Sequence, residues 1–86
     1  MTKLEQKLIE LGYEIQDTAW TYKQTRNRYF DCFVYIQFLK KENKINYYGV
    51  KPIFSIKTQQ DIDNLQQAFN QLQNDLKELN MCENNN

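Results

Sequence analysis

Apolar residues recur along the chain with three successive rhythms, first helical, then β, then helical again. Near the N-terminus, a helical spacing joins three leucines: Leu4, Leu8 and Leu11. This spacing predicts a helix over residues 3–11. Thr2 and Glu5 have the separation of a capping box, and Gly12 supplies the positive φ at which many helices end.

The middle of the chain alternates with the two-residue period of a β-strand, most clearly over residues 29–39. One row of this strand is free of charged and amide side chains, so we expect it to face the core. That row consists of Phe30, Cys32, Val34, Ile36 and Phe38. The other row, which we expect to be partly solvated, consists of Tyr29, Asp31, Phe33, Tyr35, Gln37 and Leu39.

On the N-terminal side of this strand, residues 13–25 also have β character. Their alternation slips near Asp17 and Thr18, which predicts a bulge or a kink within one strand. Residues 25–28 are expected to form the turn into the next strand, because Asn27 tolerates a positive φ.

On the C-terminal side of the strand, residues 40–44 predict a polar hairpin loop and residues 45–50 a third strand. Pro52 has no N–H to donate to a central ladder. The segment around it is therefore expected at an edge of the sheet or as a crossing segment.

The last third of the chain carries the strongest helical pattern, with Thr58 as the expected cap and Asp61 at the third helical position. Its apolar residues alternate between three- and four-residue spacings: Ile62, Leu65, Phe69, Leu72, Leu76 and Leu79. A dimeric coiled coil and a partner-binding helix are two functional interpretations of this pattern. We favour packing against the sheet, because the repeat is short and no opposite charges flank it.

The order of elements is therefore α-β-β-β-α. We predict an α+β fold in which a three-stranded antiparallel sheet has two helices packed on one face. Residues 1–81 are expected to form a single domain, and residues 82–86 a frayed tail without apolar rhythm.

Composition excludes several functions. The 86 residues include no His and two Cys, and 11 side chains of each sign give a formal net charge of zero. Catalysis by histidine and zinc sites that need imidazole are excluded, so we expect no enzyme and no cofactor. Two distant cysteines favour free thiols in a reducing cytoplasm. The first residues lack the apolar segment of a signal peptide, and no apolar run is long enough to cross a membrane.

Charge is unevenly distributed along the chain. Residues 1–17 carry a net charge of −2, residues 18–60 carry +6 and residues 61–86 carry −4. The predicted sheet is therefore basic and the helical segments are acidic. If both helices cover one face, the other face is left open with aromatic side chains among cations.

This open face is the candidate binding surface. Its expected members are Tyr29, Phe33, Tyr35, Arg26, Arg28, Lys40 and Lys41, joined by Trp20 and Tyr22 or alternatively by Tyr47. Such a surface can anchor a protein partner, since Tyr, Trp and Arg dominate protein interfaces. It can equally stack on nucleic-acid bases, and a solvated face without a ligand is the third interpretation.

Other groups carry weaker chemical signals. Asp61 and Asp63 lack the Gly and Glu that a calcium loop places after them, so they predict a helix start. Asp31 has no second carboxylate beside it for acid–base work. Cys32 is expected to behave as a buried hydrophobe without a base to activate it.

Two stretches carry a resemblance to known sequences, namely residues 4–14 (LEQKLIELGYE) and residues 58–76 (TQQDIDNLQQAFNQLQNDL). They resemble small uncharacterised accessory proteins of phages and prophages from AT-rich Gram-positive bacteria. The resemblance implies a gene of a mobile element and a bacterial cytoplasm, and it carries over no functional residues. Small phage proteins often inhibit host machinery, including CRISPR nucleases.

We therefore expect a non-enzymatic module that binds a host protein, as a monomer or weak homodimer, and that inhibits or modulates it. The alternative is binding of single-stranded nucleic acid on the basic aromatic face. The element order also matches double-stranded-RNA-binding domains. Those domains grip phosphates with lysines at the start of the second helix, where this chain is acidic, so that mode is rejected.

Overall fold

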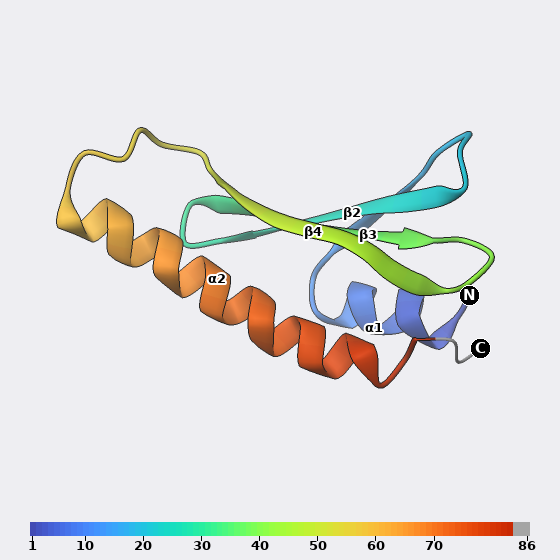
Figure 1. Cartoon of the computed structure of the whole chain (residues 1–86). Helices are drawn as coiled ribbons and strands as arrows, with labels where there is room; N and C mark the ends of the chain where they lie inside the picture. Colours follow the sequence, from blue (N-terminus) through green and yellow to red (C-terminus); the bar gives the residue numbers. More distant parts are fainter. Residues whose placement is uncertain (84–86) are drawn as a thin grey trace.

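The computed structural model describes residues 1–83 and contains two helices and four strands. The elements are α1 Lys3–Glu10, β1 Glu14–Asp17, β2 Tyr22–Tyr29, β3 Cys32–Leu39, β4 Lys44–Pro52 and α2 Gln59–Asn80. The strands form one antiparallel sheet in the order β1-β2-β3-β4, and both helices lie on the same side of it (Figure 1). The α+β class is confirmed, whereas the prediction of three strands is wrong.

The additional strand arises where the sequence predicts a kink. The irregularity near Thr18 is a full reversal of the chain over residues 18–21, which separates β1 from β2. The Thr18 hydroxyl donates to the Tyr22 carbonyl at 2.6 Å and closes the reversal. A side chain that bonds to nearby backbone in this way replaces the Gly or Pro that commonly marks a turn.

The predicted turn over residues 25–28 is also wrong, because these residues lie inside β2. Asn27 pairs with Val34 across the ladder and has no positive φ. Its amide instead donates to the Leu11 carbonyl at 3.0 Å, at the end of α1. Asn27 therefore serves tertiary packing, which a local sequence pattern does not reveal.

The hairpin between β2 and β3 turns at Phe30 and Asp31. Both have positive φ, 51° and 59°, between the paired residues Tyr29 and Cys32. Two central residues of positive φ are typical of a type I′ turn, which usually contains Asn and Gly. Phe30 is consequently 45% exposed and leaves the predicted core row, whose other four members are buried.

The ends of α1 form as the sequence predicts. The capping box of Thr2 and Glu5 is present, with both reciprocal hydrogen bonds. At the other end, Gly12 has a φ of 99°, and the Tyr13 N–H donates to the Leu8 carbonyl at 2.9 Å. This Schellman ending reverses the chain and points it into β1.

One core lies between the sheet and the helices. Its buried members are Leu4, Leu8, Tyr13, Val34, Ile36, Phe38, Leu72 and Leu79. The α2 face that contacts the sheet differs from the predicted apolar stripe, since Ala68 and Asp75 are buried while Ile62 and Phe69 are 49% and 43% exposed. The helix is thus rotated about its axis, with one edge of its apolar stripe in solvent.

A buried carboxylate explains this rotation. Asp75 is 1% exposed, and its Oδ2 accepts hydrogen bonds from the hydroxyls of Tyr13 at 2.7 Å and Tyr29 at 2.9 Å. Gln71 donates to the other oxygen at 3.1 Å. Burial and the neighbouring carboxylate raise the pKa of both tyrosines well above their ordinary value of 10.0. The cluster joins α2 to β2 and to the end of α1.

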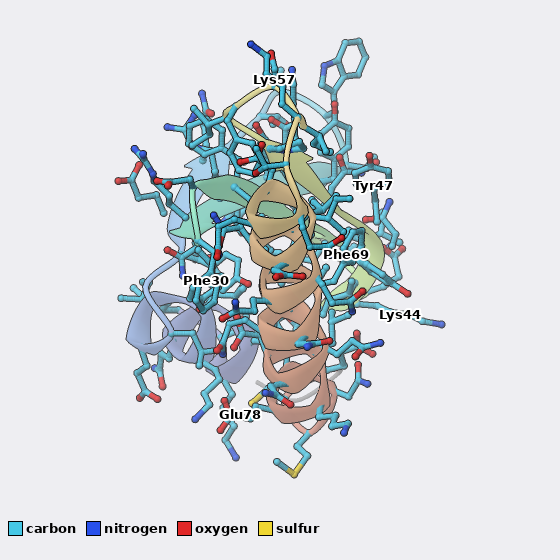
Figure 2. All side chains as sticks on the ribbon, turned by 90° about the vertical axis from the view of Figure 1, so that its left-hand side faces the viewer. Phe30, Lys44, Tyr47, Lys57, Phe69 and Glu78 are labelled. Carbon is cyan, nitrogen blue, oxygen red and sulfur yellow. The ribbon has the colours of Figure 1, made fainter. Side chains whose placement is uncertain are left out.

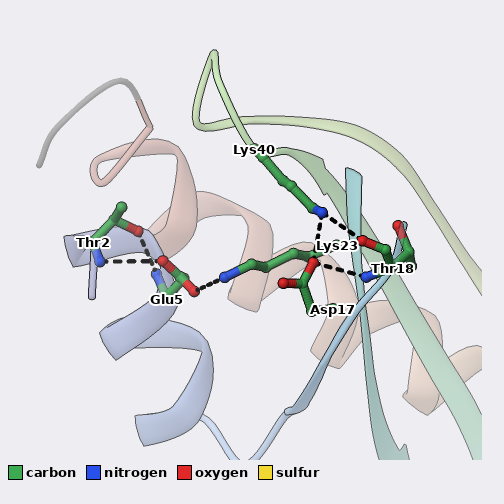
Figure 3. A network of polar contacts seen from close by, with 6 residues as sticks. All are labelled: Thr2, Glu5, Asp17, Thr18, Lys23 and Lys40. Atoms are coloured by element: carbon green, nitrogen blue, oxygen red, sulfur yellow. Dashed lines mark hydrogen bonds and ion pairs between the residues drawn. The ribbon is translucent and has the colours of Figure 1, made fainter. Parts of the chain in front are cut away.

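A second polar network fastens α1 to the sheet (Figure 3). Lys23 of β2 donates to Glu5 at 2.8 Å, and both side chains are largely shielded from solvent. Burial alone would raise the pKa of Glu5, but the hydrogen bonds from Lys23 and from the Thr2 backbone outweigh it and lower that pKa. Nearby, Lys40 pairs with Asp17 at 2.7 Å and donates to the Thr18 carbonyl.

Residues beyond α2 pack against the core beside the turn between β3 and β4 (Figure 1). Cys82 packs against the core cluster, and Glu83 accepts a hydrogen bond from the Ile45 N–H at 3.1 Å. These two residues of the predicted tail are therefore held in place, while residues 84–86 lie outside the described residues. Neither helix in residues 1–83 is long and apolar enough to cross a membrane.

We predict that Asp75→Asn lowers the free energy of unfolding by about 1–3 kcal/mol, because the hydroxyls of buried Tyr13 and half-buried Tyr29 lose a charged acceptor. Urea unfolding followed by circular dichroism measures this loss. Asp63→Asn is the matched control, since Asp63 is exposed on the same helix. Equal stability of the two variants would contradict the structural role of Asp75.

We predict that Lys23→Met destabilises the fold by about 1 kcal/mol near neutral pH. The folded-state pKa of Glu5 lies below its ordinary value of 4.5, so the ion pair adds stability above that pH. The contribution disappears as the pH falls through the folded pKa. Unfolding of wild type and Lys23→Met should therefore converge in acid. Lys41→Met, in the exposed turn, should show no pH-dependent difference.

We predict that Phe30→Asn stabilises the protein by about 0.5–1 kcal/mol, because Asn adopts a positive φ at lower cost than a bulky aromatic residue. Thermal unfolding measures the shift. Tyr35→Asn, at a strand position of ordinary φ, is the comparison and should lower stability. A lower melting temperature for Phe30→Asn would indicate that the packing of the exposed ring outweighs the turn preference.

Candidate functional site

The side of the sheet that faces away from the helices is uncovered, and we call it the open face. The register assigns these residues to it by alternation. They are Glu14, Gln16, Tyr22, Gln24, Arg26, Arg28, Phe33, Tyr35, Gln37, Leu39, Lys44, Tyr47, Gly49 and Lys51. Aromatic, cationic and amide side chains share this face.

Tyr35 occupies the centre of the open face and lines two hollows. The larger, of about 400 Å³, lies towards β1 and is bounded by Glu14, Gln16, Gln24 and Arg26 among others. The smaller, of about 260 Å³, also contacts Gln24 and is bounded on its far side by Gln37 and Tyr47. Both hollows therefore combine an aromatic wall with amide groups that donate and accept hydrogen bonds.

Gly49 shapes the β4 side of this surface. It pairs with Tyr35, so the position opposite Tyr35 on β4 has no side chain of its own. The Tyr47 hydroxyl lies 3.5 Å from where a Cβ on Gly49 would stand, which shows that the Tyr47 ring leans across the glycine. Glycine in a strand commonly marks close approach of another group, and here that group is Tyr47.

The Phe33 ring is already engaged on one face. The Arg26 guanidinium lies 4.7 Å from the ring centroid, which is cation–π geometry. Tyr35 packs at the side of Phe33, with 6.1 Å between the ring centroids. Arg28 contacts Asp31 at 3.3 Å across the hairpin turn, but both side chains are exposed and the pair is weak.

Charge on the open face is predominantly positive. Its cations are Arg26, Arg28, Lys44 and Lys51, while Glu14 is its acidic residue. Arg26 and Glu14 lie opposite each other in the register of β1 and β2, and both line the same hollow. The larger hollow thus offers both signs of charge, although the face as a whole is basic.

Four of the seven residues predicted for the binding surface lie on the open face: Arg26, Arg28, Phe33 and Tyr35. Tyr29 does not, because it belongs to β2 and pairs with Cys32 of the core row. Its hydroxyl points into the helical layer and donates to Asp75. The error arose from extending β3 through the turn, which reverses the face of every residue before it.

Lys40 and Lys41 are likewise separate from the aromatic cluster. They lie in the turn between β3 and β4, where Lys40 binds Asp17 and the Thr18 carbonyl at the end of the sheet (Figure 3). Lys41 is exposed in that turn. Of the further aromatic candidates, Tyr22 and Tyr47 lie on the open face, whereas Trp20 is 70% exposed in the reversal before β2.

The remaining chemical candidates are explained by structure. Cys32 is fully buried, and burial together with Asp31 raises the pKa of its thiol. A buried thiol with a raised pKa is a poor nucleophile. Asp61 accepts from the backbone N–H groups of Lys57 and Thr58 at the start of α2. Within residues 1–83, no three His, Cys, Asp or Glu side chains gather as a metal site.

Sequence reasoning missed three features of this surface. The amides Gln16, Gln24 and Gln37 line the hollows but carry no distinctive motif. Gly49 lies inside the predicted third strand and has no side chain that would mark it as part of a surface. Glu14 became part of the surface through the additional strand β1.

No family model, no curated protein and no solved structure matches this chain.

Proposed function

We propose that the chain is a protein-binding module that uses the open face, with side chains of the partner seated in the hollows beside Tyr35. The observation that carries this proposal is the pair of hollows of about 400 and 260 Å³ that share the Tyr35 ring. A central aromatic residue flanked by cavities is typical of an interface hot spot. The amide groups around it suit the peptide groups and polar side chains of a protein.

Single-stranded nucleic acid is the second candidate, and two contacts make it less favourable. Arg26 already stacks on Phe33, so that ring face is not free for a base. Glu14 stands in the same hollow as Arg26, where it would repel a phosphate. The exposed Tyr47 and the net positive charge of the face favour the nucleic-acid alternative.

In its more specific form, the proposal is inhibition or modulation of a host protein by a module encoded on a mobile element. Binding through one broad face would act by covering a functional surface of the partner. This form rests on the sequence resemblance and on the lack of a catalytic histidine. The open face supports binding, and the identity of the partner is left to experiment.

We predict that Tyr35→Ala weakens partner binding by about 2 kcal/mol or more, as expected for a central hot-spot residue. Affinity capture from a bacterial lysate, followed by measurement with the purified partner, tests this. Gln73→Ala, exposed on the helical side, is the matched control and should bind like wild type. Capture that is equal for both variants, or no capture by wild type, would contradict the proposal.

The same variants separate the two ligand classes. Titration of a labelled single-stranded oligonucleotide at ~50 mM salt should give no saturable binding if the surface recognises protein. Oligonucleotide binding that is abolished by Tyr35→Ala and weakened steeply by salt would replace the protein-binding proposal with the nucleic-acid alternative.

A further inference from the structure

The outer edge of β4 carries backbone groups that face away from the sheet. β4 is the last strand, and the Ile53 N–H continues its ladder by donating to the Asp31 carbonyl at 3.0 Å. In an antiparallel pair, every second residue of a strand directs its backbone N–H and C=O groups to the neighbouring strand. In β4 the residues bonded to β3 include Tyr47, Gly49 and Lys51, so the N–H and C=O groups of Tyr48 and Val50 point outward. Within the described part of the chain, no element pairs with this edge.

The stretch of unpaired backbone groups on the β4 edge is limited at both ends. Pro52 ends β4 and has no N–H to offer. At the other end, the Ile45 N–H is occupied by the Glu83 carboxylate at 3.1 Å, next to an irregularity in the register. The part of the β4 edge that can pair with another strand is therefore short and centred on Tyr48 and Val50. At the Ile45 end of this part of the edge, the Glu83 carboxylate already accepts from the backbone N–H.

The two faces of β4 differ in chemistry. On the open face it presents Lys44, Tyr47, Gly49 and Lys51, and the strand contains no acidic residue. On the helical face, Tyr48 pairs with buried Ile36 and yet is 55% exposed. More than half of Tyr48 is therefore in solvent, whereas Ile36 is fully covered.

The rotation of α2 leaves a second apolar group on the same side of the molecule. Phe69 is 43% exposed and lies on the side of α2 where Tyr47 and Lys44 are found, whereas Phe30 lies on the other side (Figure 2). The α2 residues one turn on either side of Phe69 are Gln66 and Gln73, which are uncharged. An occupant of the β4 edge would therefore meet cations on one face and apolar rings on the other.

We propose that the β4 edge binds an extended segment of a partner protein in which acidic and apolar residues alternate. The segment adds a fifth strand by hydrogen bonds to Tyr48 and Val50. Its acidic side chains face Lys44 and Lys51, and its apolar side chains cover the rings of Tyr48 and Phe69. This surface is separate from the hollows beside Tyr35, so it does not depend on their function.

Charge complementarity selects this occupant over a second copy of the chain. An antiparallel pair of β4 strands would place Lys44 and Lys51 of both copies on one face, with no acidic residue on either strand. Such a pair gains no ion pairs to offset the lysines gathered on that face, whereas opposite charges across two strands stabilise pairing. An acidic partner strand removes this repulsion and adds favourable ion pairs.

The proposal is tested with a fluorescein-labelled synthetic peptide of alternating glutamate and valine. Fluorescence polarisation should show saturable binding that weakens with salt. A peptide of the same composition with glutamates and valines in separate blocks should bind more weakly, because it cannot present one chemistry to each face. Replacement of glutamate by lysine should abolish binding.

Two substitutions at one position isolate the backbone contribution. Tyr48→Ala removes the ring and retains the outward N–H, whereas Tyr48→Pro removes both. Proline is tolerated on edge strands, so the ladder to β3 should persist. We predict that Tyr48→Pro binds about tenfold more weakly than Tyr48→Ala, the effect of one hydrogen bond in an apolar setting.

Amide exchange in the wild-type protein provides a test that needs no substitution. Bound peptide should slow exchange of the Tyr48 and Val50 amides more than that of the Tyr47 and Gly49 amides, which already bond to β3. Absence of saturable peptide binding, equal affinity of Tyr48→Pro and Tyr48→Ala, or unchanged exchange would overturn the proposal. A concentration-dependent dimer that protects the same two amides would assign the edge to a second copy instead.

Discussion

The hydrogen bonds to the buried Asp75 carboxylate determine how the two layers of this protein fit together. A charge in a protein interior is stable only when its oxygens are hydrogen-bonded, and here two tyrosine hydroxyls and a glutamine amide meet that need. The donors come from three places in the chain: the segment between α1 and β1, the end of β2 and the preceding turn of α2. Asp75 thereby holds α2 in its rotation and ties it to Tyr13 and Tyr29.

This rotation of α2 leaves part of its apolar stripe exposed to solvent. Hydrophobic burial alone would place the centre of the stripe against the sheet. The structure instead turns Asp75 inward and leaves Ile62 and Phe69 partly in water. The polar cluster thus specifies one packing arrangement among several that hydrophobicity would allow, and it creates the exposed apolar groups beside β4.

Local signals account for the parts of the fold that the sequence predicts well. Both ends of α1, the start of α2, the buried row of β3 and the edge position of β4 follow from capping residues, two-residue alternation and Pro52. The loop between β3 and β4 lies where it was predicted, but the two earlier turns were misplaced because they do not use the usual residues. Thr18 closes one reversal through its hydroxyl, and Phe30 occupies a positive φ that Asn or Gly would normally take.

The candidate site was predictable only where strand boundaries were correct. Phe33 and Tyr35 lie on the open face because the alternation within β3 holds, and Arg26 and Arg28 lie there through pairing with that strand. The prediction for Tyr29 was wrong because the expected strand extended three residues too far, through the turn that precedes β3. Long-range contacts such as those of Asp75 leave no periodic trace, since a single polar residue on a helix resembles a solvated one.

The two-layer architecture separates the residues that stabilise the protein from those that can bind. Even-numbered positions from 32 to 38 in β3 are buried, while odd-numbered positions face solvent on the uncovered side. Substitutions at the odd positions can therefore accumulate without disturbing the core. A lineage of such proteins could exchange one binding specificity for another through a few open-face changes that leave the core intact, and so follow a partner that itself changes.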